Sequence, residues 1–494
     1  MAISRRLGAV LVAATVTVTI GAAPATAGTG RAQDPTGAGG HGGVGGGGAG
    51  HGGVGGGHGG AGAPGAPGVG DGYFPAAGNG GYDALHYGLE IRYEPTTRAF
   101  AGVATISARA TDRLSRFNLD LRGFEVRSVT VDGRPARYDR DGQELRITPR
   151  YGLRRGERFT VVVRYDGTTG RPTDIEGALY GWVSTPDGSF VANEPEGAST
   201  WYPVNDHPTD KASYDFRITV PAGRTAVANG ELVGRWTSRG WTTFAWRARD
   251  PMASYLSTAS VGDYDLRRST GPRGLPIIDA VDRDLGPEAA DGLARTAEMI
   301  EYFTELFGRY PFTSYGAIVD DDTDAGYALE TQTRPIYSGP PRESTVAHEL
   351  AHQWYGNSVS PVRWQEIWLN EGFASYAEWL WEEHTGGRTA QARFDTNYAR
   401  PETAGFWNPP PGDPGADNLF AGSVYIKGAM TLHALRTTIG DRAFFTLLRT
   451  WYAANRDDTA STADFVRLAE KISRRQLDAF FRTWLYTPGK PAAW

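Results

Sequence analysis

The sequence has no cysteine among its 494 residues and no excess of positive charge, since its net charge is −6. Without cysteine the chain forms no disulfide bond, and any metal site must use nitrogen and oxygen ligands such as histidine and carboxylate. The negative charge argues against nucleic acid or an anionic membrane as a partner. Beyond its N-terminal region the sequence also lacks a run of roughly 18 apolar residues, which a membrane-spanning helix requires, so no membrane association is expected.

The first 27 residues have the pattern of an export signal. Arg5 and Arg6 precede an apolar run over residues 7–23, and the Ala-Thr-Ala sequence at residues 25–27 is typical of a cleavage site. We therefore expect a signal peptide that is cleaved after Ala27 and a secreted, extracellular protein. The arginine pair leaves twin-arginine export open beside the general secretory route.

The mature chain divides into segments of different composition. Glycine dominates residues 28–72, and such a stretch cannot bury apolar surface, so we expect a flexible linker there. Residues 73–266 contain short alternating apolar runs, such as residues 89–93 and 160–163, which are separated by Asp-Gly and Asn-Gly turn signals. This pattern predicts an N-terminal antiparallel β domain.

The C-terminal part, residues 267–494, has mainly helical periodicity. Two strand-like segments, at residues 315–319 and 327–333, interrupt the helices. The change from β to mostly α predicts an α+β protein of two domains, with a boundary near residue 267.

The pentapeptide HELAH at residues 348–352 carries the strongest chemical signal. In a helix, a spacing of four places His348 and His352 on one face, one turn apart, so that both imidazoles can reach a single metal ion. Glu349 then lies beside that ion, where its carboxylate can take a proton from a water molecule.

The next segment, with the sequence WLNEGFASY, argues against a pair of ordinary surface histidines. Its Glu371 follows His352 by nineteen residues, a separation that lets a turn and a second helix bring the carboxylate to the same metal. Two histidines and one glutamate leave a fourth position open, which is the arrangement of a catalytic zinc. The residues alone therefore indicate a divalent metal site at His348, His352 and Glu371.

Taken together, HELAH and the glutamate of LNEGFASY resemble the aminopeptidase N family of gluzincin zinc metallopeptidases. The resemblance extends from about residue 82 to the end of the chain. It implies one zinc ion per chain, a saddle-like N-terminal β domain and a thermolysin-like catalytic domain. Larger relatives continue into further C-terminal domains, so the resemblance implies the short, two-domain form with a more open cleft.

The resemblance also assigns three further residues. Tyr425 lies in a segment similar to the family's Tyr-x-Lys-Gly motif, whose tyrosine donates its hydroxyl to the oxyanion of the reaction. Glu330 lies in GYALET, which resembles the family's Gly-Ala-Met-Glu-Asn strand, whose glutamate binds the α-amine of the substrate. Glu194, in NEPEGA, looks like the second acid that reaches the same amine, and Glu196 is the alternative to it.

Two carboxylates that bind one ammonium group would hold the N-terminus of a peptide at a fixed distance from the metal, so that only the first peptide bond reacts. The hypothesis from the sequence is therefore a secreted zinc aminopeptidase acting on peptides with a free N-terminus. A zinc endopeptidase, or another hydrolase on the same scaffold, is the alternative. A catalytically inactive secreted binding protein is the remote alternative.

The sequence leaves the role of one further pair of residues open and predicts no catalytic role for an acidic cluster. Either Asn370 or Glu378 could support a metal ligand. The acidic residues Asp320–Asp322 and Asp324 are expected to form a solvated loop rather than a calcium site, because their spacing matches no calcium-binding loop.

Overall fold

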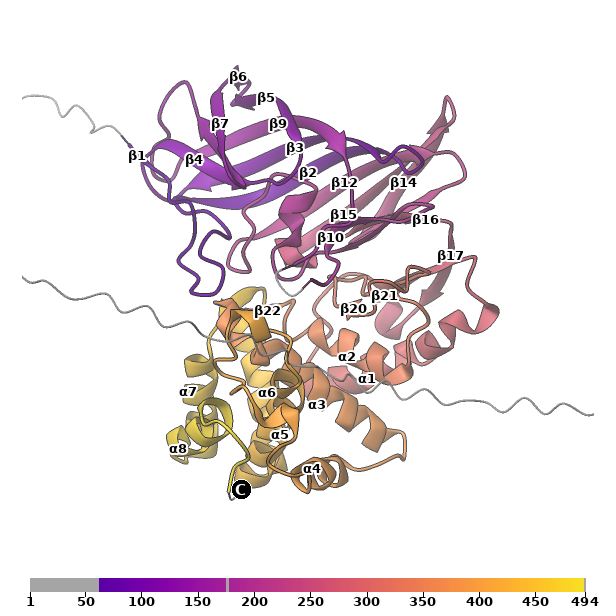
Figure 1. Cartoon of the computed structure of the whole chain (residues 1–494). Coiled ribbons are helices and arrows are strands. Elements are labelled where there is room, and N and C mark those ends of the chain that lie inside the picture. The colour runs from indigo at the N-terminus through magenta and orange to yellow at the C-terminus, as the bar shows by residue number, and fades with distance from the viewer. Residues whose placement is uncertain (1–61, 175–176, 493–494) are drawn as a thin grey trace, which may run out of the picture. The chain divides into compact units, whose positions relative to one another are not determined.

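The computed structural model describes residues 62–174 and 177–492 (Figure 1). The predicted signal peptide, residues 1–27, and residues 28–61 of the predicted linker lie outside the described residues. The end of the predicted linker, residues 62–72, is folded instead, because Ala63 pairs with Leu114 and the buried Asp71 accepts a hydrogen bond from the N–H of Trp364. Strands occupy most of the chain as far as residue 282, and helices follow (Figure 1). The predicted α+β order of a β domain followed by a mainly helical domain is confirmed.

An eight-stranded sheet forms the frame of the β domain. Its residues alternate between buried and exposed positions along each central strand, which is the pattern of a sheet with one face in the core. Neighbouring strands are antiparallel except for β12 and β2, which are parallel. In spatial order the strands are β14 (Glu231–Ser238), β15 (Trp241–Ala253), β12 (Lys211–Pro221), β2 (Tyr82–Glu94), β3 (Ala99–Ala110), β9 (Arg158–Thr168), β5 (Glu125–Val131) and β6 (Arg134–Pro135).

Two four-stranded sheets complete the β domain. Trp182 fixes one of them against the large sheet, because its buried ring lies 5.0 Å from the rings of both Tyr93 and Phe100. That sheet contains β10 (Gly181–Ser184), β11 (Ser189–Ala192), β16 (Ala259–Gly262) and β13 (Thr225–Ala228), and the other contains β1 (Ala63–Pro64), β4 (Leu114–Asp120), β8 (Glu144–Thr148) and β7 (Arg137–Asp141).

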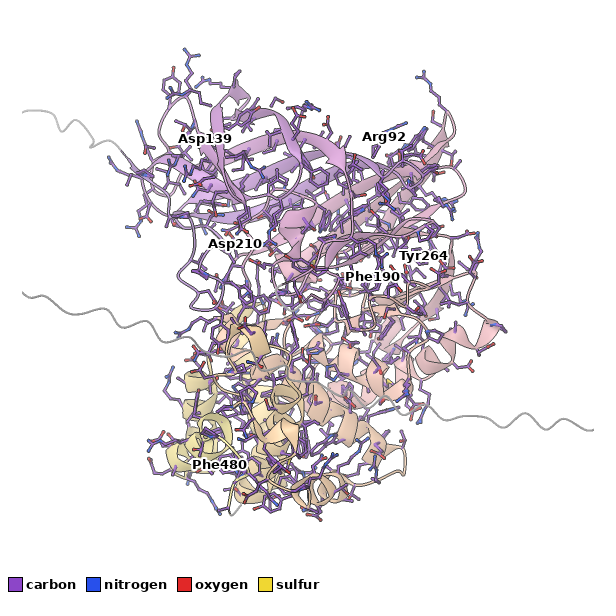
Figure 2. All side chains as sticks on the ribbon, viewed as in Figure 1. Arg92, Asp139, Phe190, Asp210, Tyr264 and Phe480 are labelled. Carbon is purple, nitrogen blue, oxygen red and sulfur yellow. The ribbon has the colours of Figure 1, made fainter. Side chains whose placement is uncertain are left out.

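One side of the β domain faces the helical part. Figure 2 shows Phe190 of β11 close to the helices, whereas Arg92 and Asp139 lie on the opposite side of the domain. The ring of Phe190 packs edge-to-face on Tyr327, with 5.9 Å between the ring centroids. The β domain and the helical part therefore share a packed boundary.

A five-stranded mixed sheet begins the C-terminal part, and helices follow it. The strands, in spatial order, are β17 (Tyr264–Thr270), β18 (Pro276–Asp282), β19 (Tyr315–Asp320), β21 (Ile336–Ser338) and β20 (Ala328–Leu329). Two of the loops pair through short parallel strands, β22 (Val359–Pro361) and β23 (Asp458–Ala460). The helices are α1 (Thr296–Phe307), α2 (Glu343–His352), α3 (Trp368–His384), α4 (Ala390–Tyr398), α5 (Gly422–Ile439), α6 (Asp441–Asn455), α7 (Thr462–Ser473) and α8 (Asp478–Phe481).

Aromatic packing holds α2 in place. Trp354, two residues beyond the end of α2, is fully buried and lies 5.9 Å from the ring of Phe307 and 5.3 Å from that of Tyr310. Its indole N–H donates to the carbonyl of Gly308 at 2.9 Å. Because these partners follow or end α1, they tie the C-terminal end of α2 to α1.

The structure corrects one predicted element. The strand expected at residues 327–333 is limited to β20, Ala328–Leu329, and the chain then turns. Thr333 has a φ angle of 64°, in the left-handed region, which no strand residue adopts. The domain boundary predicted near residue 267 falls inside β17 and stays a prediction.

Across residues 62–174 and 177–492, none of the helices is both long enough and apolar enough to cross a lipid bilayer.

Candidate active site

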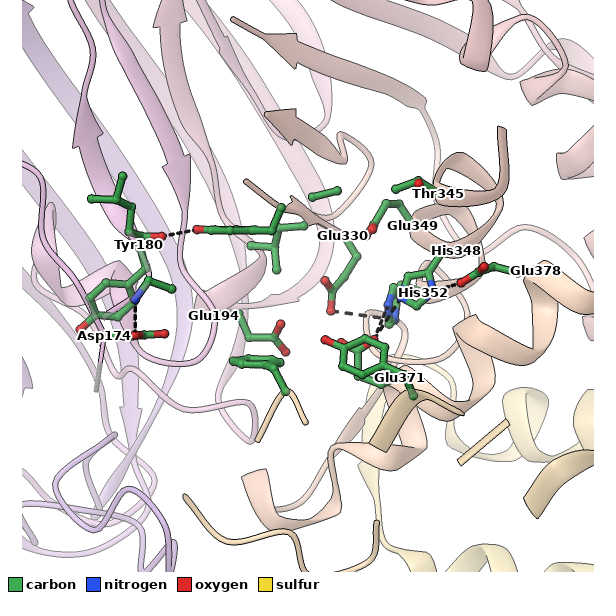
Figure 3. Close-up of a pocket in the computed structure, with 17 residues that line it drawn as sticks. Asp174, Tyr180, Glu194, Glu330, Thr345, His348, Glu349, His352, Glu371 and Glu378 are labelled. Carbon is green, nitrogen blue, oxygen red and sulfur yellow. Dashed lines mark hydrogen bonds and ion pairs between the residues drawn. The ribbon is translucent and has the colours of Figure 1, made fainter. Parts of the chain in front are cut away.

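Helices α2 and α3 bring together the three predicted metal ligands (Figure 3). His348 and His352 lie one turn apart on α2, and their ring centroids are 4.7 Å apart. Glu371 lies in the first turn of α3, where its Oε2 is 3.1 Å from Nε2 of His348 and 3.5 Å from Nε2 of His352. All three side chains are buried, so two nitrogens and one carboxylate converge on one shielded point.

The opposite nitrogen of each imidazole has its own acceptor. His348 Nδ1 lies 2.8 Å from the carboxylate of Glu378, and His352 Nδ1 lies 3.1 Å from the carbonyl of Tyr355. An N–H on Nδ1 leaves the lone pair of Nε2 directed at Glu371, which is the tautomer that a metal ligand needs. Of the two residues left undecided by the sequence, Glu378 contacts a ligand, whereas Asn370 donates instead to the hydroxyl of Tyr255 at 3.4 Å.

The residues present fit a divalent cation. Within the described residues, three buried polar atoms of the site have no hydrogen-bond partner. They are Nε2 of His352, one carboxylate oxygen of Glu194 and one of Glu330. Carboxylate oxygens of Glu194, Glu330 and Glu371 lie within 4.8 Å of one another. Three clustered carboxylates require positive charge nearby. No Lys or Arg of the described chain lines the cavity that they share.

Glu349 occupies the same cavity as Glu371, but the pKa values of the two carboxylates are shifted in opposite directions. Burial raises the pKa of Glu371, but positive charge on the side of His352 and His348 outweighs that effect and holds the pKa below its usual range, as a metal ion held there would also do. Burial raises the pKa of Glu349 to about 8, although the same imidazoles act in the opposite direction. Burial thus makes Glu349 the more basic of the two carboxylates, which suits a group that accepts a proton from a neighbouring water.

Glu330 and Glu194 face the metal ligands from two different elements (Figure 3). Glu330 directly follows the edge strand β20, and its Oε1 lies 3.9 Å from Nδ1 of His352. Glu194 comes from a loop of the β domain and is only 8% exposed. Glu196, the alternative to Glu194, pairs with Arg122 at 2.6 Å and does not line this cavity. The structure thus brings Glu194, rather than Glu196, to the site.

Tyr425 enters the site from α5. Its ring is nearly parallel to that of His348, with centroids 6.0 Å apart, and it lines the cavity beside the metal ligands. Two glycines bring α5 close to α3, because a Cβ on Gly428 would lie 2.9 Å from the Cα of Gly372. The backbones of α3 and α5 therefore touch where the helices cross. The contact lies one residue after Glu371 on α3 and three residues after Tyr425 on α5.

This crossing makes a testable prediction. Gly428→Ala should lower the free energy of unfolding by about 1–3 kcal/mol, because the added methyl group meets rigid backbone rather than a mobile side chain. Denaturant unfolding measures the change. Gly405→Ala is the control, because a Cβ at Gly405 meets nothing within 4 Å. Equal stability of the two variants would contradict a backbone contact at the crossing.

The cavity has a volume of about 400 Å³, and every predicted site residue lines it. Its far wall includes Leu179 of the β domain, whose carbonyl accepts a hydrogen bond at 2.5 Å from the hydroxyl of Tyr327, which directly precedes β20. Tyr327 stands where the family motif has glycine, so this wall departs from the pattern that the sequence resembles. The lining residues are Asp174, Ala178, Leu179, Tyr180, Glu194, Tyr327, Ala328, Leu329, Glu330, Thr345, His348, Glu349, His352, Glu371, Glu378, Phe420 and Tyr425.

The acidic residues just before β20 have a structural partner. Arg171 of the β domain pairs with Asp322 at 2.9 Å and with Asp324 at 3.1 Å. Asp320 is buried and accepts a hydrogen bond from the hydroxyl of Tyr264. These three residues therefore join elements of the fold, and none of them lines the cavity.

Comparison with protein families gives two matches. The peptidase family M1 domain matches residues 329–484, and the peptidase M1 N-terminal domain matches residues 83–256. The first match contains all three predicted metal ligands, and the second contains Glu194.

Individual relatives agree with these matches. Aminopeptidase A of Gloydius brevicauda is 24% identical over 455 residues, which are 82% of this chain and 46% of the relative. Human glutamyl aminopeptidase is 25% identical over 456 residues, 82% of this chain and 47% of the relative. Leukotriene A-4 hydrolase of Xenopus laevis is 23% identical over 83% of this chain and 72% of the relative. The chain thus spans about half the length of the two aminopeptidases.

Solved structures match over their whole length. The M1 zinc metallopeptidase of Deinococcus radiodurans has 30% sequence identity and a TM-score of 0.79, and the match covers 86% of this chain and 98% of that one. An alanine mutant of the same enzyme, solved with the substrate Tyr-Ser-Ala, gives the same identity and TM-score and is covered to 99%. With both family domains matched in order and a full-length relative at this identity, the chain belongs to peptidase family M1.

Proposed function

We propose that this protein is a zinc-dependent aminopeptidase that removes the N-terminal residue from peptides. The observation that carries the proposal is the position of Glu194 and Glu330, whose carboxylates lie beside the pair of histidines and Glu371 within one cavity. A metal site alone would serve any hydrolase of this scaffold. Two further carboxylates, with no Lys or Arg of the described chain in their cavity, are suited to a substrate that brings its own ammonium group.

His348, His352 and Glu371 would hold the zinc ion, and Glu378 would keep His348 in the required tautomer. When bound, zinc supplies a Lewis acid, which polarises the carbonyl of the scissile bond and makes water more acidic. The D. radiodurans relatives named as zinc metallopeptidases support the choice of metal.

Glu349 moves the proton in this proposal. It lines the cavity next to the metal ligands, and its buried carboxylate lies within 4.8 Å of side-chain atoms of His352 and Glu330. A carboxylate there can accept a proton from the attacking water and return it to the leaving amine nitrogen. Because the same carboxylate serves both transfers, no second acid is needed.

Tyr425 and the two amine-binding acids orient the substrate. The hydroxyl of Tyr425 can donate to the oxygen of the carbonyl under attack, where negative charge develops. Glu330 and Glu194 bind the α-ammonium group and hold it at one distance from the metal. Only the first peptide bond then reaches the reacting water, which is the definition of aminopeptidase action.

The proposal predicts a strong preference for a free N-terminus. Acetylation removes the positive charge and leaves the carboxylates of Glu194 and Glu330 unpaired in a buried site, so kcat/KM for the blocked peptide should fall severely. Glu330→Ala should raise KM and lower kcat/KM for the free peptide, because a charge-assisted contact contributes about 1.5–3 kcal/mol. Steady-state hydrolysis of one peptide, free and acetylated, measures both effects.

The neighbouring acids supply a matched pair for this experiment. Glu194→Gln should weaken the preference for a free amine, whereas Glu196→Gln should leave it unchanged, since Glu196 pairs with Arg122 outside the cavity. Equal rates for the free and acetylated peptides, with cleavage at an internal bond, would replace aminopeptidase with endopeptidase.

A further inference from the structure

The backbone at Glu330 is held by two side-chain amides from the end of the metal-binding helix. The carbonyl of Glu330 accepts a hydrogen bond from Nε2 of Gln353 at 3.2 Å and one from Nδ2 of Asn357 at 2.7 Å. Both donors are fully buried. The main chain that carries the Glu330 carboxylate is therefore tied directly to the segment that follows His352.

Gln353 makes a second contact with the same turn. Its Oε1 accepts a hydrogen bond from the backbone N–H of Thr333 at 2.8 Å, while its Nε2 lies 3.4 Å from the carbonyl of Glu349. One amide group thus spans α2 and both ends of the turn formed by residues 330–333. Gln353 itself does not line the cavity, so it acts only through the residues that it holds.

We infer that Gln353 is a positioning residue, which fixes the distance between the amine-binding carboxylate of Glu330 and the metal site and thereby selects the peptide bond that is cleaved. The inference rests on the proposed aminopeptidase function. Its physical basis is that Glu330 lies only 3.9 Å from the imidazole of His352, a partner that attracts the carboxylate. A rigid backbone keeps the carboxylate available for an ammonium group instead.

The β domain holds the same turn from its other side. Nδ2 of Asn229 donates to the carbonyl of Gln332 at 2.8 Å, and the N–H of Gly230 donates to the hydroxyl of Thr333 at 2.8 Å. Loss of the Gln353 amide would therefore leave the turn attached to the β domain and release it from α2 alone. The expected defect is a shift of Glu330 relative to the metal rather than a loss of the turn.

Gln353→Met tests the inference, because methionine keeps the length and removes all three hydrogen bonds. The test compares two inhibitors: leucine hydroxamate, which has a metal-binding group and a free amine, and its N-acetyl derivative, which keeps only the metal-binding group. The ratio of their two inhibition constants measures the preference for the free amine. We expect the preference for the free amine to fall by about tenfold, since misplacement of about 1 Å costs this much or more. Metal content and inhibition by the acetylated compound should stay as in the wild type. In turnover, KM should rise more than kcat falls.

Gln332→Met is the matched control. Gln332 is buried in the same turn, but its Nε2 donates to the carbonyl of Pro251 at 3.3 Å and it makes no hydrogen bond to Glu330 or α2 within the described structure. It should lose stability and keep the wild-type ratio of inhibition constants. A purely structural role of Gln353 predicts the same result for both variants.

Asn357→Ala removes the other donor to the carbonyl of Glu330 from outside the helix, and it should lower the preference in the same direction. This variant decides the matter if Gln353→Met does not fold. The inference would be overturned if the wild type clearly preferred the free amine and every folded variant of Gln353 and Asn357 kept the wild-type ratio of inhibition constants. A wild-type enzyme without any preference for the free amine would instead contradict the proposed function itself.

Discussion

Glu349→Gln is expected to retain zinc and to lose turnover by on the order of 10³–10⁴-fold, the contribution of a positioned proton acceptor. Glutamine has the size and shape of glutamate but cannot take a proton from water at the pH of the reaction. The three residues placed to hold the metal are untouched by the change. Metal analysis together with the hydrolysis rate of a free-amine peptide separates the two properties.

The same helix provides the control. Glu343, in the first turn of α2, accepts hydrogen bonds from Arg295 and Trp381 and does not line the cavity, so Glu343→Gln should keep nearly full activity. Loss of zinc from Glu349→Gln would show that Glu349 is a ligand rather than a base. Near-normal turnover of that variant would remove Glu349 from the mechanism.

His352→Ala is expected to abolish both metal retention and activity. The purified wild-type protein should contain about one zinc ion per chain and lose activity to 1,10-phenanthroline, because the Nε2 nitrogens of both histidines and a Glu371 oxygen converge on one point. Removing one of three protein ligands leaves too few to retain the ion. Activity of the chelated wild type should return on addition of zinc, whereas that of the variant should not.

His433 offers a buried histidine outside the site for comparison. It lies in α5, is 4% exposed, and its Nδ1 is 3.1 Å from the hydroxyl of Tyr376. His433→Ala should therefore lower the thermal stability and keep the zinc. Wild-type metal content and activity in His352→Ala would exclude His352 as a metal ligand.

Departures of the structure from the sequence-based predictions occur where a partner is distant along the chain. Glu194 and Glu196 are two residues apart in one loop, and only the pairing of Glu196 with Arg122 decides which of them faces the cavity. In the same way, Glu378 was distinguished from Asn370 by its contact with His348, which depends on how α3 packs on α2. The strand expected at residues 327–333 ended early because the side chains of Gln353, which directly follows α2, and of Asn229 in the β domain hold a turn there.

The sequence by itself determined the order of β and α parts, the family resemblance and the spacing of the histidine pair. The order of the parts and the histidine spacing follow from local periodicity, because 3.6 residues per turn place His348 and His352 on one helix face whatever surrounds them. Only the tertiary structure decided that Glu378 contacts His348 and that Glu194, rather than Glu196, lines the cavity. These outcomes depend on the packing of α3 on α2 and on the pairing of Glu196 with Arg122, and both join segments that no local pattern relates to one another.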